Sequence, residues 1–174
     1  MDRPPLPCDP ETRRRVFDAF YRLPARQVMD PTLEKAAFIG LHTPVLEALG
    51  ILAGVDHAWV VERPGEDRRV LSILLRRDLV RALQPAEDSY SRLVGARSRS
   101  LAHGAADCTC CFTEGRVLHG VGPEAPCRQV VHLMNATGAL YIPVLEGNDL
   151  VGEIGSLQVI RALHRIHREL EILP

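Results

Sequence analysis

Three cysteines in the second half of the sequence are the residues whose type and spacing best suit metal binding or redox chemistry. Cys108, Cys110 and Cys111 form a Cys-x-Cys-Cys run, and His103 lies five residues before it. Zinc prefers four cysteine or histidine ligands, usually supplied as two spaced pairs, and this run has no second pair at such a spacing. Further ligands elsewhere in the chain would be Cys8, His119 or Cys127. A zinc site or a redox-sensitive thiol pair therefore stays an alternative to small interior residues of a strand.

The sequence lacks the motifs of the common hydrolases and phosphate-binding enzymes. It contains no Gly-x-Ser-x-Gly, no His-Glu-x-x-His and no glycine-rich loop that would cradle a phosphate. His42, His57 and His132 fall at the ends of predicted elements or on a helix face, and they form no triad-like set. We therefore expect a protein that is not an enzyme and requires no cofactor.

Composition excludes several classes of protein. The 174 residues are 46% hydrophobic and 25% charged, which is typical of a globular chain, and the net charge of −1 argues against nucleic-acid binding. No apolar run approaches the 18 residues of a membrane span. The N-terminal residues have no apolar core of a signal peptide, and the five cysteines are odd in number and irregularly spaced. We expect a cytoplasmic protein with no membrane and no nucleic-acid partner.

Periodicity and turn residues predict the order of elements in the first half. After a proline-rich tail, residues 11–22 have one apolar helical face. Thr43 and Pro44 indicate a helix start, with the Thr43 hydroxyl capping free backbone N–H groups. Short β-type runs predict strands at 36–39, 57–61 and 69–75, and a further helix is predicted from Asp78.

The same order returns after residues 84–116, which fit no regular pattern beyond an irregular helix near 91–103. The second half predicts a strand at 117–121, a helix after the turn at 122–126, a hairpin of strands at 139–145 and 150–154, and a helix at 157–170. Local matches support an internal repeat, because residues 78–83 align with 158–163 and residues 59–62 align with 143–146. The chain is therefore predicted to hold two βαββα units.

The motifs of both halves resemble the CBS domain, named after cystathionine beta-synthase. The first half has Val28-Met29-Asp30-Pro31, the Thr43-Pro44 helix start, and Ile73-Leu74-Leu75-Arg76-Arg77-Asp78-Leu79; the second has Ile142-Pro143-Val144-Leu145-Glu146 and Leu150-Val151-Gly152-Glu153-Ile154. The resemblance implies a tandem CBS pair (a Bateman module) with an α/β fold, two CBS-like units packed as one pair and an extra N-terminal helix. The predicted boundaries are an N-terminal tail and helix at 1–22, units at 23–85 and 104–174, and a linker at 86–103.

The resemblance also implies where a ligand would bind. Family members join the last strand to the last helix through Gly-hydrophobe-hydrophobe-(Thr/Ser)-x-x-Asp, in which the carboxylate holds the ribose hydroxyls. Asp78 matches that carboxylate, although it would also suit a helix cap. Gln158 replaces the carboxylate in the second half. The ligand residues implied are Asp78, Arg76 and Arg77 for the ribose and phosphate, Phe38 and Ile39 as a first-strand wall, and Ser156 as a shifted hydroxyl.

The function implied is a regulatory module that senses AMP, ADP, ATP or S-adenosylmethionine in a cleft between the two units. The alternatives are a ligand-free module for dimerisation and protein interaction, or the thiol or zinc sensor at the cysteine run. We expect a homodimer to which the first and last helices contribute, although both helices could equally cover their own unit. We also expect a separate, unidentified protein to be the one regulated.

Overall fold

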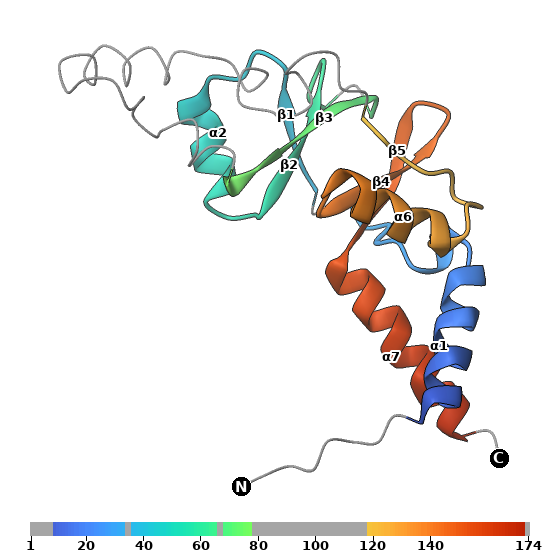
Figure 1. Cartoon of the computed structure of the whole chain (residues 1–174). Helices are drawn as coiled ribbons and strands as arrows, with labels where there is room; N and C mark the ends of the chain where they lie inside the picture. Colours follow the sequence, from blue (N-terminus) through green and yellow to red (C-terminus); the bar gives the residue numbers. More distant parts are fainter. Residues whose placement is uncertain (1–8, 34–35, 66–67, 78–117, 173–174) are drawn as a thin grey trace, which may run out of the picture. The chain divides into compact units, whose positions relative to one another are not determined.

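The protein is described from a computed structural model that places residues 9–33, 36–65, 68–77 and 118–172. The chain divides into two compact units (Figure 1). We call residues 32–118 and 148–150 the sheet unit, and residues 1–31, 119–147 and 151–174 the helical unit. Among the described residues, no helix combines the length and the apolar character that crossing a bilayer requires.

The sheet unit contains a three-stranded sheet in the order β1-β2-β3. Its elements are β1 (Ala37–Gly40), α2 (Val45–Leu52), β2 (His57–Val61) and β3 (Val70–Leu75). β1 and β2 are parallel and are connected through α2, whereas β2 and β3 are antiparallel. This is the βαββ order that the sequence predicts. The core beside α2 is aliphatic and includes Ile39, Val45, Ala48, Leu52, Val60 and Leu74.

The start of α2 differs from the sequence prediction in one detail. Thr43 does not cap the helix, because Pro44 is the residue at the N-cap and no side chain caps the helix there. The Thr43 hydroxyl instead accepts a hydrogen bond at 2.9 Å from the backbone N–H of Gly40. Thr43 therefore closes the turn between β1 and α2, and the backbone N–H groups of Glu47 and Ala48 donate to the carbonyl oxygen of Pro44 instead.

The helical unit combines three helices with a two-stranded sheet. Its elements are α1 (Pro10–Arg22), the short 3₁₀ turn η1 (Ala25–Gln27), α6 (Cys127–Thr137), β4 (Tyr141–Glu146), β5 (Asp149–Gly155) and α7 (Ser156–Ile172). The first two residues of β5, 149 and 150, are counted in the sheet unit. β4 and β5 are connected through Gly147, whose φ of +65° suits the tight turn predicted at this point. α1 packs against α6 and α7, and their shared core includes Val16, Phe20, Val130, Ile142, Ile154 and Ile166.

The strand predicted at 117–121 is much shorter in the structure. Residue 117 lies outside the described residues, and 118–120 have no regular structure. Only Val121 forms a bridge, which is parallel and pairs it with Val144. Gly120 lies so close to Leu145 that a Cβ would come within 2.7 Å of its Cδ1. The position is therefore a close crossing of two segments, which the local sequence around Gly120 does not signal.

The second half nevertheless repeats the first in its order of elements. A parallel bridge, a helix, two consecutive paired strands and a final helix follow one another from Val121 to Ile172. The helix predicted from Asp78 lies outside the described residues, so the alignment of residues 78–83 with 158–163 is described only in its second copy. The predicted domain boundaries stay predictions.

Candidate functional site

The two residues predicted as a ligand wall lie next to each other on β1. Ile39 is 1% exposed and belongs to the core of the sheet unit. Phe38 is half-buried and lies opposite Trp59 in the register of β1 and β2. Neighbouring residues of a strand point to opposite faces, so these two side chains have different surroundings. A ligand contact at either residue stays a prediction.

Arg76 has a structural role that the sequence did not reveal. Its guanidinium donates to the backbone carbonyls of Leu52 at 3.0 Å and Val55 at 2.9 Å, and it pairs with the carboxylate of Asp56 at 3.2 Å. These carbonyls lie at the C-terminal end of α2 and just after it, where helix carbonyls have no partner within the helix. Arg76 therefore ties the C-terminal end of α2 to the residue that directly follows β3. A phosphate contact by Arg76 would compete with these bonds.

Several other predicted site residues are not tested by the structure. Asp78 lies outside the described residues, and so does the whole cysteine run with its histidine: His103, Cys108, Cys110 and Cys111. Arg77 is exposed. Within the described part of the chain, no group of three or more histidine, cysteine or acidic residues could hold a metal ion.

Burial raises the pKa of the Cys127 thiol to about 11, so Cys127 is a poor ligand in the folded chain.

The N-terminus of α7 carries the second-half signature. The amide oxygen of Gln158 accepts a hydrogen bond at 3.0 Å from the backbone N–H of Gly155, three residues earlier. This is the reach-back half of a capping box, in which the third residue of a helix satisfies the N–H at its start. Ser156 is exposed on the first turn. Gln158 therefore caps its helix. Helix capping was also the alternative explanation for Asp78, the residue that aligns with Gln158 in the first half.

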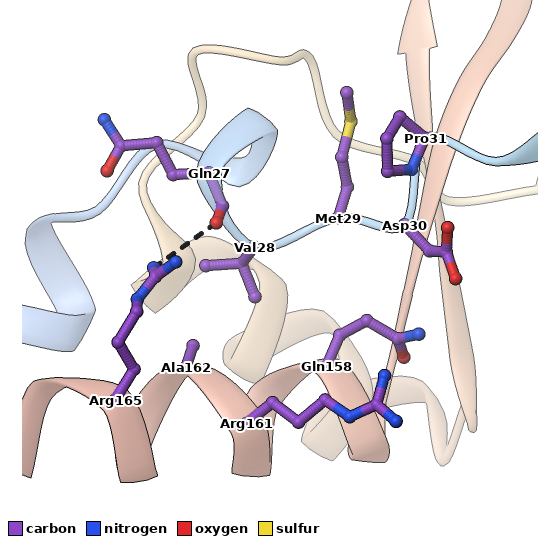
Figure 2. Close-up of a pocket in the computed structure, with 9 residues that line it drawn as sticks. All are labelled: Gln27, Val28, Met29, Asp30, Pro31, Gln158, Arg161, Ala162 and Arg165. Atoms are coloured by element: carbon purple, nitrogen blue, oxygen red, sulfur yellow. Dashed lines mark hydrogen bonds between the residues drawn. The ribbon is translucent and has the colours of Figure 1, made fainter.

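A cavity of about 340 Å³ lies beside this helix end, within the helical unit. One wall is the extended segment after η1, and the other is one face of α7 (Figure 2). The residues from α7 lie three or four positions apart, so that their side chains share a face. The lining residues are Gln27, Val28, Met29, Asp30, Pro31, Gln158, Arg161, Ala162 and Arg165. The volume falls at the lower end of the range of roughly 300–1,000 Å³ that is usual for small-molecule sites.

The extended wall is held in place mostly by its backbone. Asp30 and Glu153 exchange two hydrogen bonds, one from Asp30 N–H at 2.8 Å and one from Glu153 N–H at 3.1 Å. A Cβ on Gly152 would lie 2.5 Å from the sulfur of Met29 and 3.1 Å from the carbonyl oxygen of Asp30. Only glycine therefore lets the wall lie this close to β5. At the other end of the wall, Arg165 donates to the carbonyl oxygen of Gln27 at 3.4 Å, the dashed bond of Figure 2.

Charged and neutral polar groups gather at the cavity. Two arginines and one aspartate line it, which leaves one net positive charge. Arg161 and Arg165 are both exposed, so their guanidinium groups lie where the cavity meets solvent. Gln158 is half-buried and neutral. The remaining lining includes the apolar side chain of Val28, so that the cavity offers an apolar surface together with hydrogen-bond donors.

Comparison with known protein families identifies the first repeat. Residues 25–85 match the family model of the CBS domain. The chain contains a CBS domain. The resemblance predicted from the motifs of the first half is therefore confirmed. No sequence among the curated proteins matches the chain.

Solved CBS structures share the fold over most of the chain. The CBS-pair protein CBSX2 from Arabidopsis thaliana is 18% identical, with a TM-score of 0.63 over 83% of this chain and 96% of CBSX2. A structure of CBSX2 in complex with AMP gives 17% identity and a TM-score of 0.62, over 82% of this chain and 97% of that one. The CBS domain of a bacterial CNNM/CorC family Mg²⁺ transporter in complex with ATP is 14% identical, with a TM-score of 0.64 over 88% of this chain and 96% of that one. These comparisons confirm the mixed α/β CBS fold.

The cavity includes residues that the sequence analysis did not select. Val28, Met29 and Asp30 were used only as part of the family resemblance, and Arg161 and Arg165 were not selected as site residues. The spacing of Gln158, Arg161 and Arg165 places them on one face of a helix, which was a usable signal. The partner segment at 27–31 is more than 120 residues away in sequence, and nothing in a single sequence indicates that it lies beside this face.

Proposed function

We propose that this chain is a regulatory, non-catalytic module that binds an adenosine-containing ligand: AMP, ADP, ATP or S-adenosylmethionine. The observation that carries the proposal is the cavity at Gln158, because this position aligns with the ribose-binding aspartate of the CBS signature. Two CBS structures with similar folds contain AMP or ATP, which supports the choice of ligand class.

The lining chemistry supports the same class of ligand. Val28 offers apolar surface for a purine ring. The Gln158 side chain keeps its two amide hydrogens, since only its oxygen is used by the Gly155 N–H. These hydrogens can donate to ribose hydroxyl oxygens, but they cannot accept from them as a carboxylate does. We therefore expect weaker ribose recognition than an aspartate would provide.

A regulatory role agrees with the absence of the common catalytic motifs from the sequence and with the CBS fold. The proposal includes a homodimer in the cytoplasm and a separate protein whose activity the module controls. A ligand changes such a protein only if it binds one conformation better than another. The competing proposals are a ligand-free interaction module and a thiol or zinc sensor at Cys108, Cys110 and Cys111.

The decisive experiment is a binding panel on the purified chain. Calorimetry and thermal unfolding with AMP, ADP, ATP, S-adenosylmethionine and NAD would be measured for wild type, Gln158→Ala and Asp78→Ala. A ligand at 100 times its dissociation constant adds about 2.7 kcal/mol, which corresponds to a rise in melting temperature of roughly 5–10 °C. We expect at least one adenosine compound to bind, and Gln158→Ala to weaken it.

The two variants separate the possible sites. Loss of binding in Gln158→Ala alone supports the cavity of the helical unit, whereas loss in Asp78→Ala alone assigns the ligand to the first repeat. Circular dichroism of Gln158→Ala controls for loss of the helix cap. If no adenosine compound binds, the sensor proposal fails. Metal analysis of protein purified without added metal then distinguishes the zinc sensor from the ligand-free module.

A further inference from the structure

The cavity is basic on its α7 side. Arg161 and Arg165 follow Gln158 on the same face, one turn apart, which places their backbones about 6 Å from each other. Asp30 on the opposite wall is the one acidic residue among the lining residues. In Figure 2 the Arg161 side chain lies along the wall toward Gln158, and the Arg165 side chain extends toward Gln27. Both guanidinium groups thus border the same space.

These arginines retain most of their hydrogen-bonding capacity. A guanidinium carries five N–H donors in a planar fork. Arg165 donates to the carbonyl oxygen of Gln27 at 3.4 Å, a long bond that leaves its other donors available. Within the described residues, Arg161 has no carboxylate partner. Such forks match the geometry of phosphate oxygens, and bonds between charged partners are stronger than neutral ones.

The replacement of an aspartate by Gln158 changes the charge of the cavity. An aspartate at this position would cancel one of the two arginine charges, whereas glutamine leaves the net charge at plus one. A phosphate chain is attracted to such a site. S-adenosylmethionine has one carboxylate but two cationic groups, a sulfonium and an ammonium, so its net positive charge gives it less attraction to this site than a phosphate chain has. The substitution therefore bears on which adenosine compound binds.

We propose that the cavity selects phosphorylated adenosine over adenosine and S-adenosylmethionine, and that Arg161 and Arg165 determine this specificity by holding the phosphates. The proposal rests on the proposed function, because it assumes that the cavity holds an adenosine compound. It deepens that function by naming the charge class of the ligand. The phosphates lie at the exposed arginine side of the cavity, and the nucleoside lies against Val28.

The test is calorimetric binding of ADP, adenosine, S-adenosylmethionine and inorganic pyrophosphate to the full chain. It compares wild type with Arg161→Gln, Arg165→Gln and the double variant. Arg14→Gln is the matched control, because the Arg14 side chain is exposed on the outer side of α1, forms a 3.8 Å surface pair with Asp18 and does not line the cavity. In wild type we expect ADP to bind at least tenfold more tightly than adenosine or S-adenosylmethionine. Each cavity variant should weaken ADP about tenfold and leave adenosine unchanged, as loss of one charge-assisted bond predicts.

The outcomes separate this inference from the proposed function. If adenosine or S-adenosylmethionine binds as tightly as ADP, the charge selectivity is wrong while the adenosine sensor stands. If pyrophosphate binds in an arginine-dependent manner and no adenosine compound binds, the phosphate-binding role of the arginines stands while the adenosine sensor fails. A loss of ADP affinity in Arg14→Gln equal to that in the cavity variants would mean that net charge, not the cavity, determines binding.

Discussion

A single glycine, Gly152, decides how closely the extended wall of the cavity at residues 27–31 approaches β5. At Gly152 the obstacle to a Cβ is both the flexible end of Met29 and the backbone carbonyl of Asp30. Met29 can rotate away, but the carbonyl can move only if the paired hydrogen bonds between Asp30 and Glu153 are strained. The requirement for glycine here is therefore steric, and it arises from the backbone of a segment far away in sequence.

We expect Gly152→Ala to destabilise the chain by about 1–3 kcal/mol, the usual cost of overpacking, and to weaken ligand binding because the wall at 27–31 is displaced. Urea unfolding and calorimetry measure the two effects. Gly122→Ala is the control, because no atom lies within 4 Å of the Cβ position at Gly122, and its effect should stay within about 0.5 kcal/mol. Equal stability of the two variants would contradict the close contact at Gly152.

Cys127 gives a prediction with a defined pH dependence. Burial raises the pKa of its thiol from 9.0 to about 11, because the folded state disfavours the thiolate. The folded chain therefore holds this proton more tightly than the unfolded chain, and the resulting stability is fully present below pH 9 and lost as the pH rises through about 11. Urea unfolding of wild type should show this loss, and Cys127→Ala should lack this component of it.

The reactivity of Cys127 provides a second measurement of the same burial. At pH 8 iodoacetamide should leave Cys127 unmodified in the native chain and alkylate it after unfolding, as peptide mass spectrometry can detect. Alkylation of Cys127 in the native chain at the rate of the unfolded chain would show that the thiol is not buried.

At the scale of elements, helices and strands with a strong apolar period were predicted well, and short contacts between distant segments were not. The predicted strands at 57–61 and 69–75 and the helix at 157–170 lie within a few residues of β2, β3 and α7. The Val121 bridge and the extended wall at 27–31 depend on partners elsewhere in the chain, so local pattern carries little information about them. The predicted Thr43 cap was wrong for a related reason. The Thr43 hydroxyl accepts a hydrogen bond from the backbone N–H of Gly40 and not from an N–H group of α2.

The packing of α1 predicts how much two of its aromatic side chains contribute to the stability of the helical unit. Phe20 is 1% exposed in the core that α1 shares with α6 and α7, whereas Phe17 is 40% exposed three residues earlier. Phe20→Ala should destabilise the protein by about 3–5 kcal/mol, since it leaves a large cavity. Phe17→Ala should cost roughly 1 kcal/mol, mainly through its stacking on Tyr21. Urea unfolding compares the two, and similar losses would contradict the packing of α1 on its own unit.

For the molecule as a whole, the motifs predicted the CBS fold, whereas the site residues that they assigned stay predictions. Family resemblance selected Asp78, which lies outside the described residues, and Arg76, whose guanidinium holds the end of α2. The described cavity instead combines a segment at the start of the first repeat with a helix from the second repeat. A site built from segments this distant requires the tertiary structure, because each segment alone has an ordinary local pattern.

The final prediction concerns the oligomeric state. α1 packs within its own unit, while Leu157 and Ile160 on α7 are 51% and 62% exposed and lie three residues apart on one face. Burying each such side chain stabilises an interface by about 1.5–3 kcal/mol, so this face of α7 is the surface through which we expect two copies to associate. Light scattering after gel filtration should give twice the chain mass of 19.3 kDa for wild type and the single mass for Ile160→Glu. Leu46→Glu is the control, because Leu46 is 63% exposed on α2 of the sheet unit, and it should remain dimeric. A dimer that persists in Ile160→Glu would show that the interface lies elsewhere, and a monomeric wild type would contradict the homodimer itself.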